Sequence, residues 1–551
     1  MGGDELSAEP EHAADTGNRE TAGHAEYAEY AENAARSEAG PDVERAAHTA
    51  ELLRARHVTV AGLGVSGVPA AKALHRFGAH VTVVNGGDGE GPRRQAHELE
   101  QLGIAVRLGD DRSLPEGTQL IVTTPGFRPD SALFRAAADA GVPVWGDVEL
   151  AWRLRGSAAA GGGPARPSPP WLAVTGTNGK TTTVQMLAAI LEAAGLRTAA
   201  VGNIGVSLVD VVLGAEAAEG AAADAEPYAD LDVLAVELSS YQLHWAPSLR
   251  PHSAAVLNLA PDHLDWHGSM EAYAADKGRI YEGNRAACVY NVQDPATEDL
   301  VRKADVVEGC RAVGFTLASP APGQLGVVEG ILVDRAFVAD PQREAQELAE
   351  VGDVATGAPH NVANALAAAA LARAYGVPAS AVRDGLRAFR PDAHRIAHVA
   401  DVGGVSYVDD SKATNTHATE ASLAAYDSIV WIAGGLAKGA TFDDLVREAA
   451  PRLRGAVLIG ADRALIRDAL ARHAPDVPVV DLDRTDTGAM AAAVREAARL
   501  ARSGDTVLLA PACASMDMFV NYKTRGDAFA DAVRALADGA GADTAGTDSS
   551  K

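Results

Sequence analysis

The chain has 551 residues, 47% of them hydrophobic and 22% charged, which is an ordinary composition for a globular protein of several domains. Its net charge of -26 argues against a general nucleic-acid-binding protein, because a phosphate backbone attracts basic surfaces. The 3 cysteines are too few for a disulfide framework, and the N-terminus lacks the basic start and apolar stretch of a secretory signal. Since no strongly apolar run approaches about 18 residues, we expect a cytoplasmic protein without a membrane span.

Residues 1–50 form an acidic, alanine-rich segment with 12 Asp and Glu against 3 Arg. Almost no large aliphatic residue precedes Leu52. Such a composition cannot bury enough apolar surface to offset the entropy lost on ordering. We therefore expect a disordered acidic tail, or at most a transient helix.

Residues 51–155 begin with a strand, a glycine turn, a helix and a second strand, which is the pattern of a Rossmann-like βαβ unit. Gly62, Gly64 and Gly67 form G-x-G-x-x-G at the first turn. NAD binding is disfavoured, because the second strand ends at Asn85, where a dinucleotide site places Asp or Glu. A different nucleotide ligand and simple close packing of the turn remain as alternatives.

A glycine, alanine and proline linker over residues 156–170 precedes a second α/β domain, residues 171–390. This domain opens with WLAVTGTNGKTTT, an apolar strand that runs into a glycine-containing loop and a helix. Backbone N–H groups and the helix N-terminus of such a loop face a phosphate, Lys180 adds positive charge, and Thr181 can bind magnesium. Val174 stands where the usual pattern has its first glycine, so a purely structural turn is the alternative.

Polar residues follow other predicted strands of this second domain. Glu237 ends a buried strand and could complete a magnesium site with Thr181, the alternative being a solvated strand end. His263, in the run Asp-His-Leu-Asp after another buried strand, is a candidate metal ligand or a structural histidine. Lys277, considered alone, is typical of a helix surface. Residues 214–230 are expected to be a surface loop.

Residues 391–538 alternate strand-like and helical patterns, which predicts another mostly parallel sheet with helices on both faces. The final residues, 539–551, are expected to be a flexible tail.

A series of motifs occurs in the order seen in the Mur ligases, which the chain resembles from His57 to Ala537. DDSKATN and PACASMDMF are the most specific of these motifs, and they resemble the D-glutamate-adding members. GTNGKTT and HNVAN fit any member, including folylpolyglutamate synthases. The motifs are GTNGKTT (176–182), GNIG (202–205), ELSSYQL (237–243), NLAPDHLDWHG (258–268), DKGRIY (276–281), HNVAN (360–364), HR (394–395), DDSKATN (409–415) and PACASMDMF (511–519).

The resemblance implies three α/β domains: a Rossmann-like domain for a UDP-linked substrate, a central P-loop ATPase-like domain with a mostly parallel sheet, and a Rossmann-like domain for D-glutamate. It implies a monomeric, cytoplasmic enzyme of peptidoglycan precursor synthesis that uses ATP and Mg²⁺. The implied reaction joins D-glutamate to UDP-N-acetylmuramoyl-L-alanine through an acyl phosphate. We also expect the second and third domains to close on each other, so that Arg395 and Asp410 reach ATP held by Lys180.

The resemblance also assigns roles to residues at matching positions. Those implied for ATP are Gly176, Thr177, Asn178, Gly179, Lys180, Thr181, Thr182, Asn361, Asn364, Arg395 and Asp410. Those implied for metal are Thr181, Glu237, His263 and Lys277, the last as a carbamate derived from CO₂. Those implied for the UDP-linked substrate are Val65, Ser66, Asn85, Thr124, Pro125, Gly126 and Asn203. Those implied for D-glutamate are Lys412, Thr414, Lys438, Ser515, Met516 and Tyr522. Those implied to be catalytic are Lys180, His263, Lys277, Lys412 and Lys438.

The chain departs from the Mur ligase pattern at three positions, two of them among these residues and one directly before Lys438. Asn85 replaces an acidic residue often found at the uracil site, Ala437 stands where some members have Asp, and Tyr522 where some have Phe. Two other functions fit only parts of the chain. An NAD-dependent oxidoreductase leaves Lys180 unexplained, and a P-loop regulatory switch or binding module has no use for the third domain.

Overall fold

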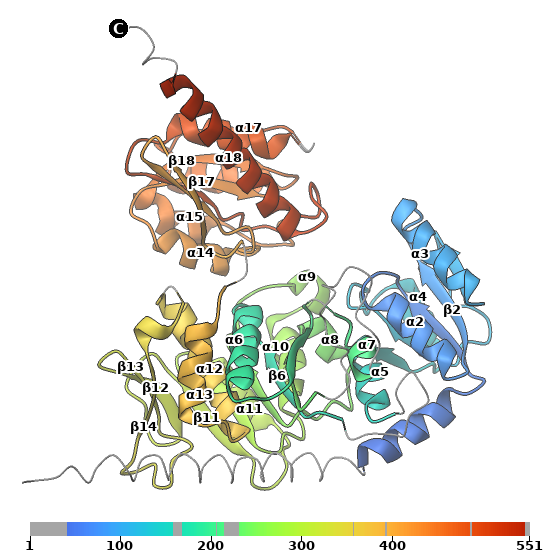
Figure 1. Ribbon diagram of the computed structural model, residues 1–551. Coiled ribbons are helices and arrows are strands. Elements are labelled where there is room, and N and C mark those ends of the chain that lie inside the picture. The colour runs from blue at the N-terminus through green and yellow to red at the C-terminus, as the bar shows by residue number, and fades with distance from the viewer. Residues whose placement is uncertain are drawn as a thin grey trace, which may run out of the picture. The chain divides into compact units, whose positions relative to one another are not determined.

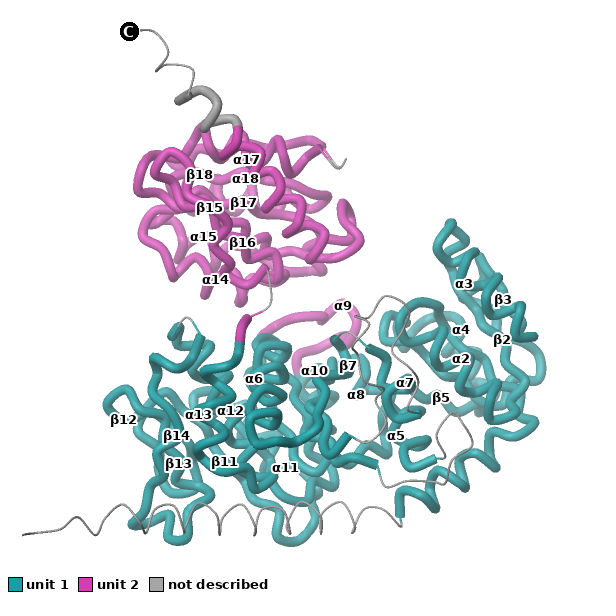
Figure 2. The backbone as a smooth tube through the Cα atoms, viewed as in Figure 1, with its two compact units in different colours: residues 1–259, 271–389 teal, residues 260–270, 390–551 magenta. Residues whose placement is uncertain are grey.

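The computed structural model describes residues 41–157, 168–204, 206–213, 231–355, 357–391, 394–484 and 488–545. Figure 1 labels the helices and strands along the chain. The chain divides into two compact units, shown in separate colours in Figure 2. Unit 1 comprises Met1–Leu259 and Glu271–Phe389, and unit 2 comprises Ala260–Met270 and Arg390–Lys551. None of the described helices is both long and apolar enough to cross a membrane.

The first sheet of unit 1 has five parallel strands in the order β3-β2-β1-β4-β5. The predicted strand, glycine turn, helix and strand are confirmed. Gly67 begins the helix against the end of the first strand, where an added Cβ would lie 2.1 Å from the carbonyl oxygen of Gly62, so this turn packs too tightly for any side chain. The elements are β1 (His57–Ala61), α2 (Gly67–Arg76), β2 (His80–Asn85), α3 (Glu90–Gln101), β3 (Ala105–Leu108), β4 (Leu120–Thr123), α4 (Ala132–Asp139), β5 (Val144–Gly146) and α5 (Asp147–Leu154).

A helix covers residues 41–53, so the predicted disorder is wrong for the part of the acidic segment that it includes. Leu53 is fully buried, and the Asp42 carboxylate accepts a 2.9 Å hydrogen bond from Arg155. Because Arg155 lies 113 residues away in the chain, the local composition of the acidic segment could not predict this hydrogen bond. Residues 1–40 lie outside the described residues.

The second sheet of unit 1 has nine strands in the order β14-β13-β12-β11-β10-β9-β6-β8-β7. The predicted strands at Trp171, Leu231 and Ala254 are confirmed as β6, β8 and β9, which pair in parallel. The antiparallel extension through β13 and β14 was not predicted. The strands are β6 (Trp171–Thr175), β7 (Thr198–Gly202), β8 (Val233–Glu237), β9 (Ser253–Val256), β10 (Ala287–Asn291), β11 (Arg311–Phe315), β12 (Gln324–Val328), β13 (Ile331–Asp334) and β14 (Gln346–Glu350).

The helices that accompany the second sheet of unit 1 follow its strands along the chain. The predicted surface loop 214–230 lies outside the described residues. The helices are α6 (Lys180–Ala193), α7 (Leu208–Val212), α8 (Ser240–His244), α10 (Met270–Gly278), η1 (Arg279–Tyr281), α11 (Pro295–Lys303), η2 (Val351–Asp353), α12 (Pro359–Ala374) and α13 (Ala379–Ala388).

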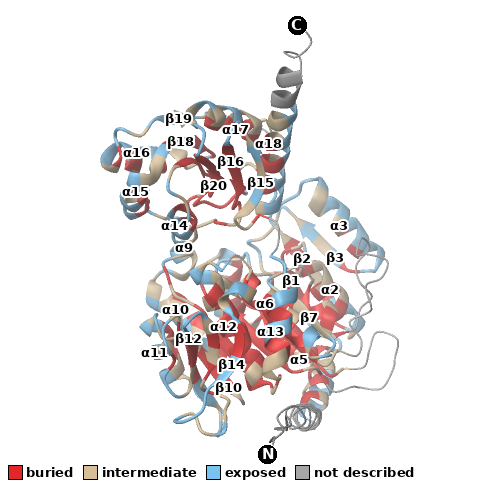
Figure 3. Cartoon of the chain, turned by 60° about the vertical axis from the view of Figure 1, so that its left-hand side comes forward, coloured by how far each residue is buried: buried red, intermediate tan, exposed pale blue. Residues whose placement is uncertain are grey.

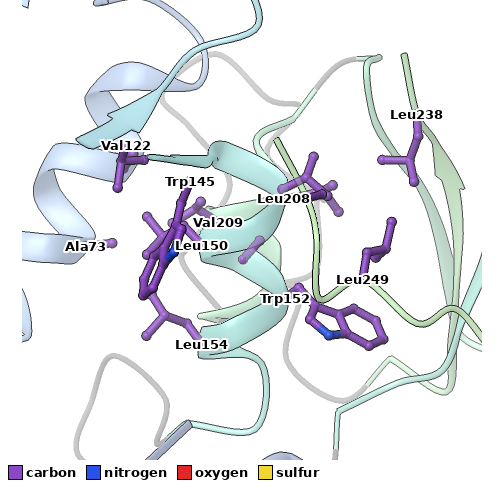
Figure 4. Packing of buried hydrophobic residues seen from close by; sticks show 14 of the residues in the cluster. Ala73, Val122, Trp145, Leu150, Trp152, Leu154, Leu208, Val209, Leu238 and Leu249 are labelled. Carbon is purple, nitrogen blue, oxygen red and sulfur yellow. The ribbon is translucent and has the colours of Figure 1, made fainter. Parts of the chain in front are cut away.

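One hydrophobic core joins the two sheets of unit 1. Figure 4 shows Trp145 of β5 and Leu150 of α5 packed with Leu208 and Val209 of α7, and Leu238 and Leu249 belong to the same cluster of buried residues. Burying so many apolar side chains in one cluster opposes independent movement of the two sheets. The first Rossmann-like sheet is therefore held firmly against the second.

Unit 2 has a six-stranded sheet in the order β15-β16-β20-β17-β18-β19, parallel except for β15. Its central strands are buried, as Figure 3 shows. Separate clusters contain residues of α15 and α16 on one face and of α17 and α18 on the other, which confirms the predicted mostly parallel sheet between two helix layers. The elements are α9 (Leu264–His267), β15 (Ala397–Val402), β16 (Val405–Asp409), α14 (Thr416–Ala424), β17 (Ile429–Gly434), α15 (Asp443–Ala449), η3 (Ala450–Arg452), β18 (Leu453–Ile459), α16 (Arg463–His473), β19 (Val479–Asp481), α17 (Ala489–Leu500), β20 (Thr506–Leu509) and α18 (Tyr522–Ala545).

Candidate active site

The glycine-containing loop joins the end of β6 to the start of α6. Gly179 adopts a left-handed conformation with φ of 83°, and an added Cβ there would lie 2.4 Å from Oδ1 of Asn364. Asn258, which follows β9, fixes the loop from the other side: its Oδ1 accepts a 2.8 Å hydrogen bond from the backbone N–H of Asn178, and its Nδ2 donates to the Asn178 carbonyl at 3.2 Å. The loop therefore has one defined shape set by two asparagines from other elements.

Lys180 is the first residue of α6, and its side chain folds back onto this loop. Its Nζ donates to the carbonyl oxygens of Gly176 and Thr177, both at 2.9 Å. The positive charge of the side chain therefore lies at the helix N-terminus, where the backbone dipoles also favour an anion. This arrangement supports the phosphate-binding prediction.

Glu237 lies at the end of β8, between β6 and β7. It is only 2% exposed, so the alternative of a solvated strand end is wrong. Its Oε2 accepts a 2.7 Å hydrogen bond from the Thr181 hydroxyl, and its Oε1 accepts a 2.9 Å bond from Nδ2 of Asn203. A carboxylate and a hydroxyl oxygen are ligands that suit Mg²⁺, an ion that shares its coordination with substrate phosphates. In the described ranges no three His, Cys, Asp or Glu side chains cluster as a metal site. A metal ion held by Glu237 and Thr181 would therefore also need oxygen ligands from substrate phosphates.

Lys277 lies near the end of α10 and is 2% exposed, so the local interpretation as a surface lysine is wrong. Its Nζ donates to the Gly176 carbonyl at 2.9 Å and lies 4.7 Å from the centre of the Tyr273 ring. The Tyr273 hydroxyl is 3.0 Å from Oγ1 of Thr177. Lys277 and Tyr273, one helical turn apart, thus both contact the phosphate loop. Tyr273 was not predicted, although its spacing from Lys277 was a usable signal.

The first turns of α12 carry the two asparagines implied for ATP. Nδ2 of Asn364 lies 3.4 Å from Oδ1 of Asn361, whose own amide lies 3.4 Å from the Ala355 carbonyl. Since Asn364 also lies against Gly179, the structure brings this helix to the loop.

The residues implied for the UDP-linked substrate follow three neighbouring strands of the first sheet. Asn85, the last residue of β2, accepts a 3.2 Å hydrogen bond from the Leu63 N–H and donates to the Gly87 carbonyl at 2.7 Å. Oγ1 of Thr124, after β4, donates to the Ala61 carbonyl at 3.1 Å. Val65 is 72% exposed in the turn after β1. Because parallel strands end at one edge, these turns form a shared rim, whereas Asn203 follows β7 of the second sheet and contacts Glu237.

In unit 2 the residues implied for D-glutamate follow β16, β17 and β20, which are neighbours in the sheet. Nζ of Lys412 lies 5.1 Å from the centre of the Tyr522 ring. Two 2.9 Å backbone hydrogen bonds between Leu436 and Ala514 join the loop of Lys438 to that of Ser515. These loops therefore lie at one edge of the third sheet. Met516 is exposed in the same loop as Ser515, and Thr414 follows Lys412.

Arg525, at the start of α18, holds this edge together and was not predicted. It is 1% exposed and donates to the hydroxyl and carbonyl of Ser411 at 3.0 and 2.8 Å and to the Cys513 carbonyl at 3.1 Å. Burial lowers the pKa of Arg525 to about 10. One cation thus ties the loop of Lys412 to the loop of Ser515.

Asp410 follows β16 and is buried near Arg395. Burial raises the pKa of Asp410 to about 6, against opposing effects of the Ser422 hydroxyl, the Arg395 charge and the Ile396 N–H. The structure therefore brings Asp410 and Arg395 together within unit 2. His263 also belongs to unit 2, where its backbone N–H donates to Oδ1 of Asp262 at 2.9 Å. That these three residues reach ATP or metal at the loop of unit 1 stays a prediction.

Comparisons with known proteins decide the family. Residues 174–372 match the family model of the Mur ligase middle domain, and residues 394–513 match that of the Mur ligase glutamate ligase domain. The chain is 78% identical over 481 residues to the UDP-N-acetylmuramoylalanine–D-glutamate ligase of Streptomyces avermitilis, an alignment that covers 87% of this chain and 98% of that protein. This chain belongs to the UDP-N-acetylmuramoylalanine–D-glutamate ligases.

More distant members of this ligase family also align over most of the chain. The ligases of Thermobifida fusca and Mycolicibacterium smegmatis, which carry the same name, are 59% and 46% identical, each over 88% of this chain and over 99% and 98% of their own lengths. Membership of the family confirms the resemblance read from the motifs. The oxidoreductase and regulatory-switch alternatives are therefore set aside.

Among solved structures, a pseudomurein peptide ligase type C from Methanothermus fervidus matches with a TM-score of 0.50 and 17% identity, covering 87% of this chain and all of that one. At this identity the likeness concerns the fold alone. It agrees with the mixed α/β architecture of three mostly parallel sheets.

Proposed function

We propose that this chain joins D-glutamate to UDP-N-acetylmuramoyl-L-alanine at the expense of ATP, giving UDP-N-acetylmuramoyl-L-alanyl-D-glutamate, ADP and phosphate. The observation that supports this most directly is the buried hydrogen bond between Thr181 and Glu237. It lies next to the phosphate loop, whose Gly176 carbonyl accepts hydrogen bonds from both Lys180 and Lys277. The identity of 78% to a ligase of that name supports the choice of substrates.

The chemistry requires an activated carboxyl group, because a carboxylate does not accept an amine directly. The terminal alanine carboxylate attacks the γ-phosphorus of ATP, and ADP leaves. The D-glutamate amine then attacks the acyl phosphate carbon, and the tetrahedral intermediate expels phosphate. Lys180, whose amine contacts the phosphate loop, would neutralise the transferring phosphoryl group, so the protein would act by positioning and electrostatics.

No side chain has to act as a nucleophile in this sequence of steps. Cys513, in the loop implied for D-glutamate, is buried, and burial raises the pKa of its thiol to about 12. A thiol with this pKa stays protonated near neutral pH and is a poor nucleophile. Cys513 is therefore a structural part of the loop that Arg525 holds.

The residues present fit a magnesium ion. Thr181 and Glu237 would hold it, and Asn203 orients the carboxylate by its hydrogen bond to Oε1. When bound, the ion would neutralise charge on the phosphate oxygens. We further propose His263 as a ligand for a second ion, by resemblance to the family.

Lys277 fits the proposed carbamate. A neutral amine adds CO₂ through a new N–C bond and loses one proton, which leaves an anionic group with an N–H still able to donate to the Gly176 carbonyl. The side chain is buried next to Tyr273 and Thr175, away from bulk water. Carbamate oxygens here would add to the oxygen ligands that Glu237 and Thr181 provide.

The D-glutamate site is proposed at the edge of the third sheet. Lys412 and Lys438 offer two cations for the two carboxylates of D-glutamate, and Ser515, Thr414 and Tyr522 offer hydroxyl groups. The uridine diphosphate part would lie at the rim formed by the turns after β1, β2 and β4.

The test of the proposed function is ADP release by the purified chain with ATP, Mg²⁺, UDP-N-acetylmuramoyl-L-alanine and D-glutamate, with each substrate omitted in turn. We expect ADP release only when both substrates are present, together with a product heavier than the uridine substrate by one glutamyl residue. ADP release that does not depend on both would refute the proposal.

A further inference from the structure

Residues 460–462, which follow β18, contact the loop that carries Lys438, although none of them is among the residues proposed for D-glutamate. Asp462 is the last residue before α16. Its Oδ2 accepts a 2.8 Å hydrogen bond from the N–H of Ala437, which is buried. The backbone N–H of Asp462 donates to the Gly435 carbonyl at 3.0 Å. Asp462 therefore holds the loop of Lys438 with both its side chain and its backbone.

The carboxylate of Asp462 is not used in the way that its position suggests. Asp462 is the N-cap residue of α16, where an aspartate ordinarily accepts a hydrogen bond from a backbone N–H of the first helical turn. Within the described first turn of α16, its side chain accepts no such capping bond. It accepts a bond instead from Ala437, 25 residues earlier in the chain. Capping of the helix thus does not account for this carboxylate, whereas fixing the loop of Lys438 does.

Lys438 lies in a tight turn that starts at Ala437. The Ala440 N–H donates to the Ala437 carbonyl at 2.9 Å, and the two central residues, Lys438 and Gly439, have φ of 51° and 80°. Positive φ at both central positions is typical of a type I′ turn. A residue with a long side chain seldom adopts this conformation, so the surrounding contacts must hold it there. Because Ala437 is the first residue of the turn, its hydrogen bond to Asp462 fixes the turn that presents Lys438.

Residues 460–462 also hold the loop that carries Ser515. The Ala461 N–H donates to Oδ2 of Asp517 at 2.8 Å. Asp517 lies two residues after Ser515 in the same loop. One short segment after β18 therefore contacts both of the loops that carry Lys438 and Ser515, and it fixes each of them at a position close to a residue proposed for D-glutamate.

We propose that Asp462 is a positioning residue for D-glutamate, which holds the turn of Lys438 so that the amine of this lysine meets a substrate carboxylate. The inference rests on the proposed function and deepens it, because it adds the end of β18 to the strand ends of β16, β17 and β20 that carry the proposed site. Asp462 acts through its hydrogen bond to Ala437 and not through contact with the substrate. The role requires an acceptor oxygen at the position of Oδ2, which an amide carbonyl can also supply.

The test is ADP release by the full chain with D-glutamate varied at saturating ATP and uridine substrate. In Asp462→Ala the buried Ala437 N–H loses its partner, so we expect the KM for D-glutamate to rise about tenfold. The loss should appear in the KM and not in kcat, because Lys438 would bind a carboxylate that does not react. Asp462→Asn keeps an acceptor oxygen and should stay within about threefold of the wild type.

Two comparisons limit the effect to the D-glutamate site. The KM values for ATP and for the uridine substrate should stay within about twofold of the wild type in both Asp462 variants, because those sites are proposed on other sheets. Asp468→Ala is the matched control. It removes an exposed carboxylate from the same helix, α16, and should leave the KM for D-glutamate unchanged.

The Lys438→Ala variant shows whether Asp462 acts through Lys438. Once the lysine amine is absent, holding its turn no longer helps to bind the substrate, so adding Asp462→Ala should raise the KM for D-glutamate by less than about twofold further. An equal increase with and without Lys438 would overturn the positioning role. A wild-type KM in Asp462→Ala, or a loss in Asp462→Asn as large as in Asp462→Ala, would overturn it as well.

A further variant keeps the inference testable if Asp462→Ala folds poorly. Serine favours a helix N-cap as aspartate does, so Asp462→Ser should preserve α16, but its hydroxyl oxygen lies one bond nearer the backbone and would not reach Ala437. We expect the same rise in the KM for D-glutamate, and an unchanged KM would overturn the inference. A wild-type chain without substrate-dependent ADP release would instead overturn the proposed function, and with it this inference.

Discussion

Oγ1 of Thr181 donates a 2.7 Å hydrogen bond to Oε2 of Glu237, although the two residues are 56 positions apart in the chain. The contact exists because β6 and β8 are adjacent parallel strands in which Val174 is paired with Glu237. The phosphate loop follows β6, and α6 begins at the same edge of the sheet where β6 and β8 end. A hydroxyl and a carboxylate thus meet at a helix N-terminus, in surroundings that favour a bound cation with its phosphate ligands.

Replacing Glu237 with glutamine should weaken the proposed magnesium site. The amide is nearly isosteric but uncharged, so we expect the Mg²⁺ concentration for half-maximal activity to rise about tenfold or more and kcat to fall about a hundredfold. The measurement is ADP release over a magnesium titration. Glu192→Gln, at the exposed end of α6, is the control and should match the wild type. An unchanged magnesium requirement in Glu237→Gln would rule out this residue as a metal ligand.

Removing the Lys277 amine should abolish most activity. In Lys277→Ala the Gly176 carbonyl keeps its hydrogen bond from Lys180, so the loop should hold its shape while the proposed carbamate is lost. We expect activity to fall about a hundredfold and to recover in part when acetate supplies a carboxylate in the vacated space. Lys303→Ala, on the exposed surface of α11, serves as the control.

The wild type offers a readout of the carbamate that does not depend on activity. Enzyme equilibrated with ¹³C-labelled bicarbonate should show a carbamate carbon signal that Lys277→Ala lacks. Full activity of the alanine variant without acetate, or a signal of equal size in both proteins, would contradict the assignment.

The strands and the phosphate loop could be predicted from the sequence because their signals are local. The apolar stretch Trp171–Thr175 and the glycines after it lie within a few residues of Lys180 and specify strand, turn and helix together. The parallel strands of the third sheet follow from the same kind of alternation. The antiparallel β13 and β14 escaped prediction because their short stretches carry no comparable pattern.

Much of the candidate site could not be predicted, because its contacts join distant parts of the chain. Asn258 fixes Asn178 across 80 residues, and Arg525 reaches Ser411 across 114. Lys277 is an ordinary helix lysine in its local sequence, and the Gly176 carbonyl, which accepts a hydrogen bond from its buried amine, lies 101 residues away in the chain. Its importance came from the family motif rather than from any local pattern.

Arg525 is expected to determine the stability of the edge of the third sheet at which the D-glutamate site is proposed. Arg525→Lys would leave one donor group in place of three directed bonds, so buried carbonyls of Ser411 and Cys513 would lose partners at a cost of about 1–3 kcal/mol each. Hydrogen exchange should show faster opening of β16 and β20, and the KM for D-glutamate should rise. Arg534→Lys, an exposed position on the same helix, should change neither. Wild-type exchange rates in Arg525→Lys would show that the edge is held by other contacts.

Asp410 should make the stability of unit 2 depend on pH. Its pKa is raised by burial from 3.8 to about 6, so the native state binds a proton more tightly than the unfolded state does. The favourable contribution of the protonated carboxyl is complete below the unfolded pKa near 4 and is lost as pH rises through about 6. A shift of about two units corresponds to about 3 kcal/mol. The stability of Asp410→Asn relative to the wild type should therefore increase by up to that amount between pH 4 and pH 8.

Hydrogen exchange of β16 measured at several pH values is suited to this comparison, because a chain of several domains does not unfold in one two-state step. The asparagine loses part of the hydrogen bonding that Asp410 receives from Ser422 and Ile396, so its stability at low pH can fall below that of the wild type. That loss is nearly independent of pH, whereas the cost of the buried charge is not. The slope between pH 4 and pH 8 therefore isolates the charge. A difference between the two proteins that stays constant over this range would mean that the Asp410 carboxyl titrates near its ordinary pKa.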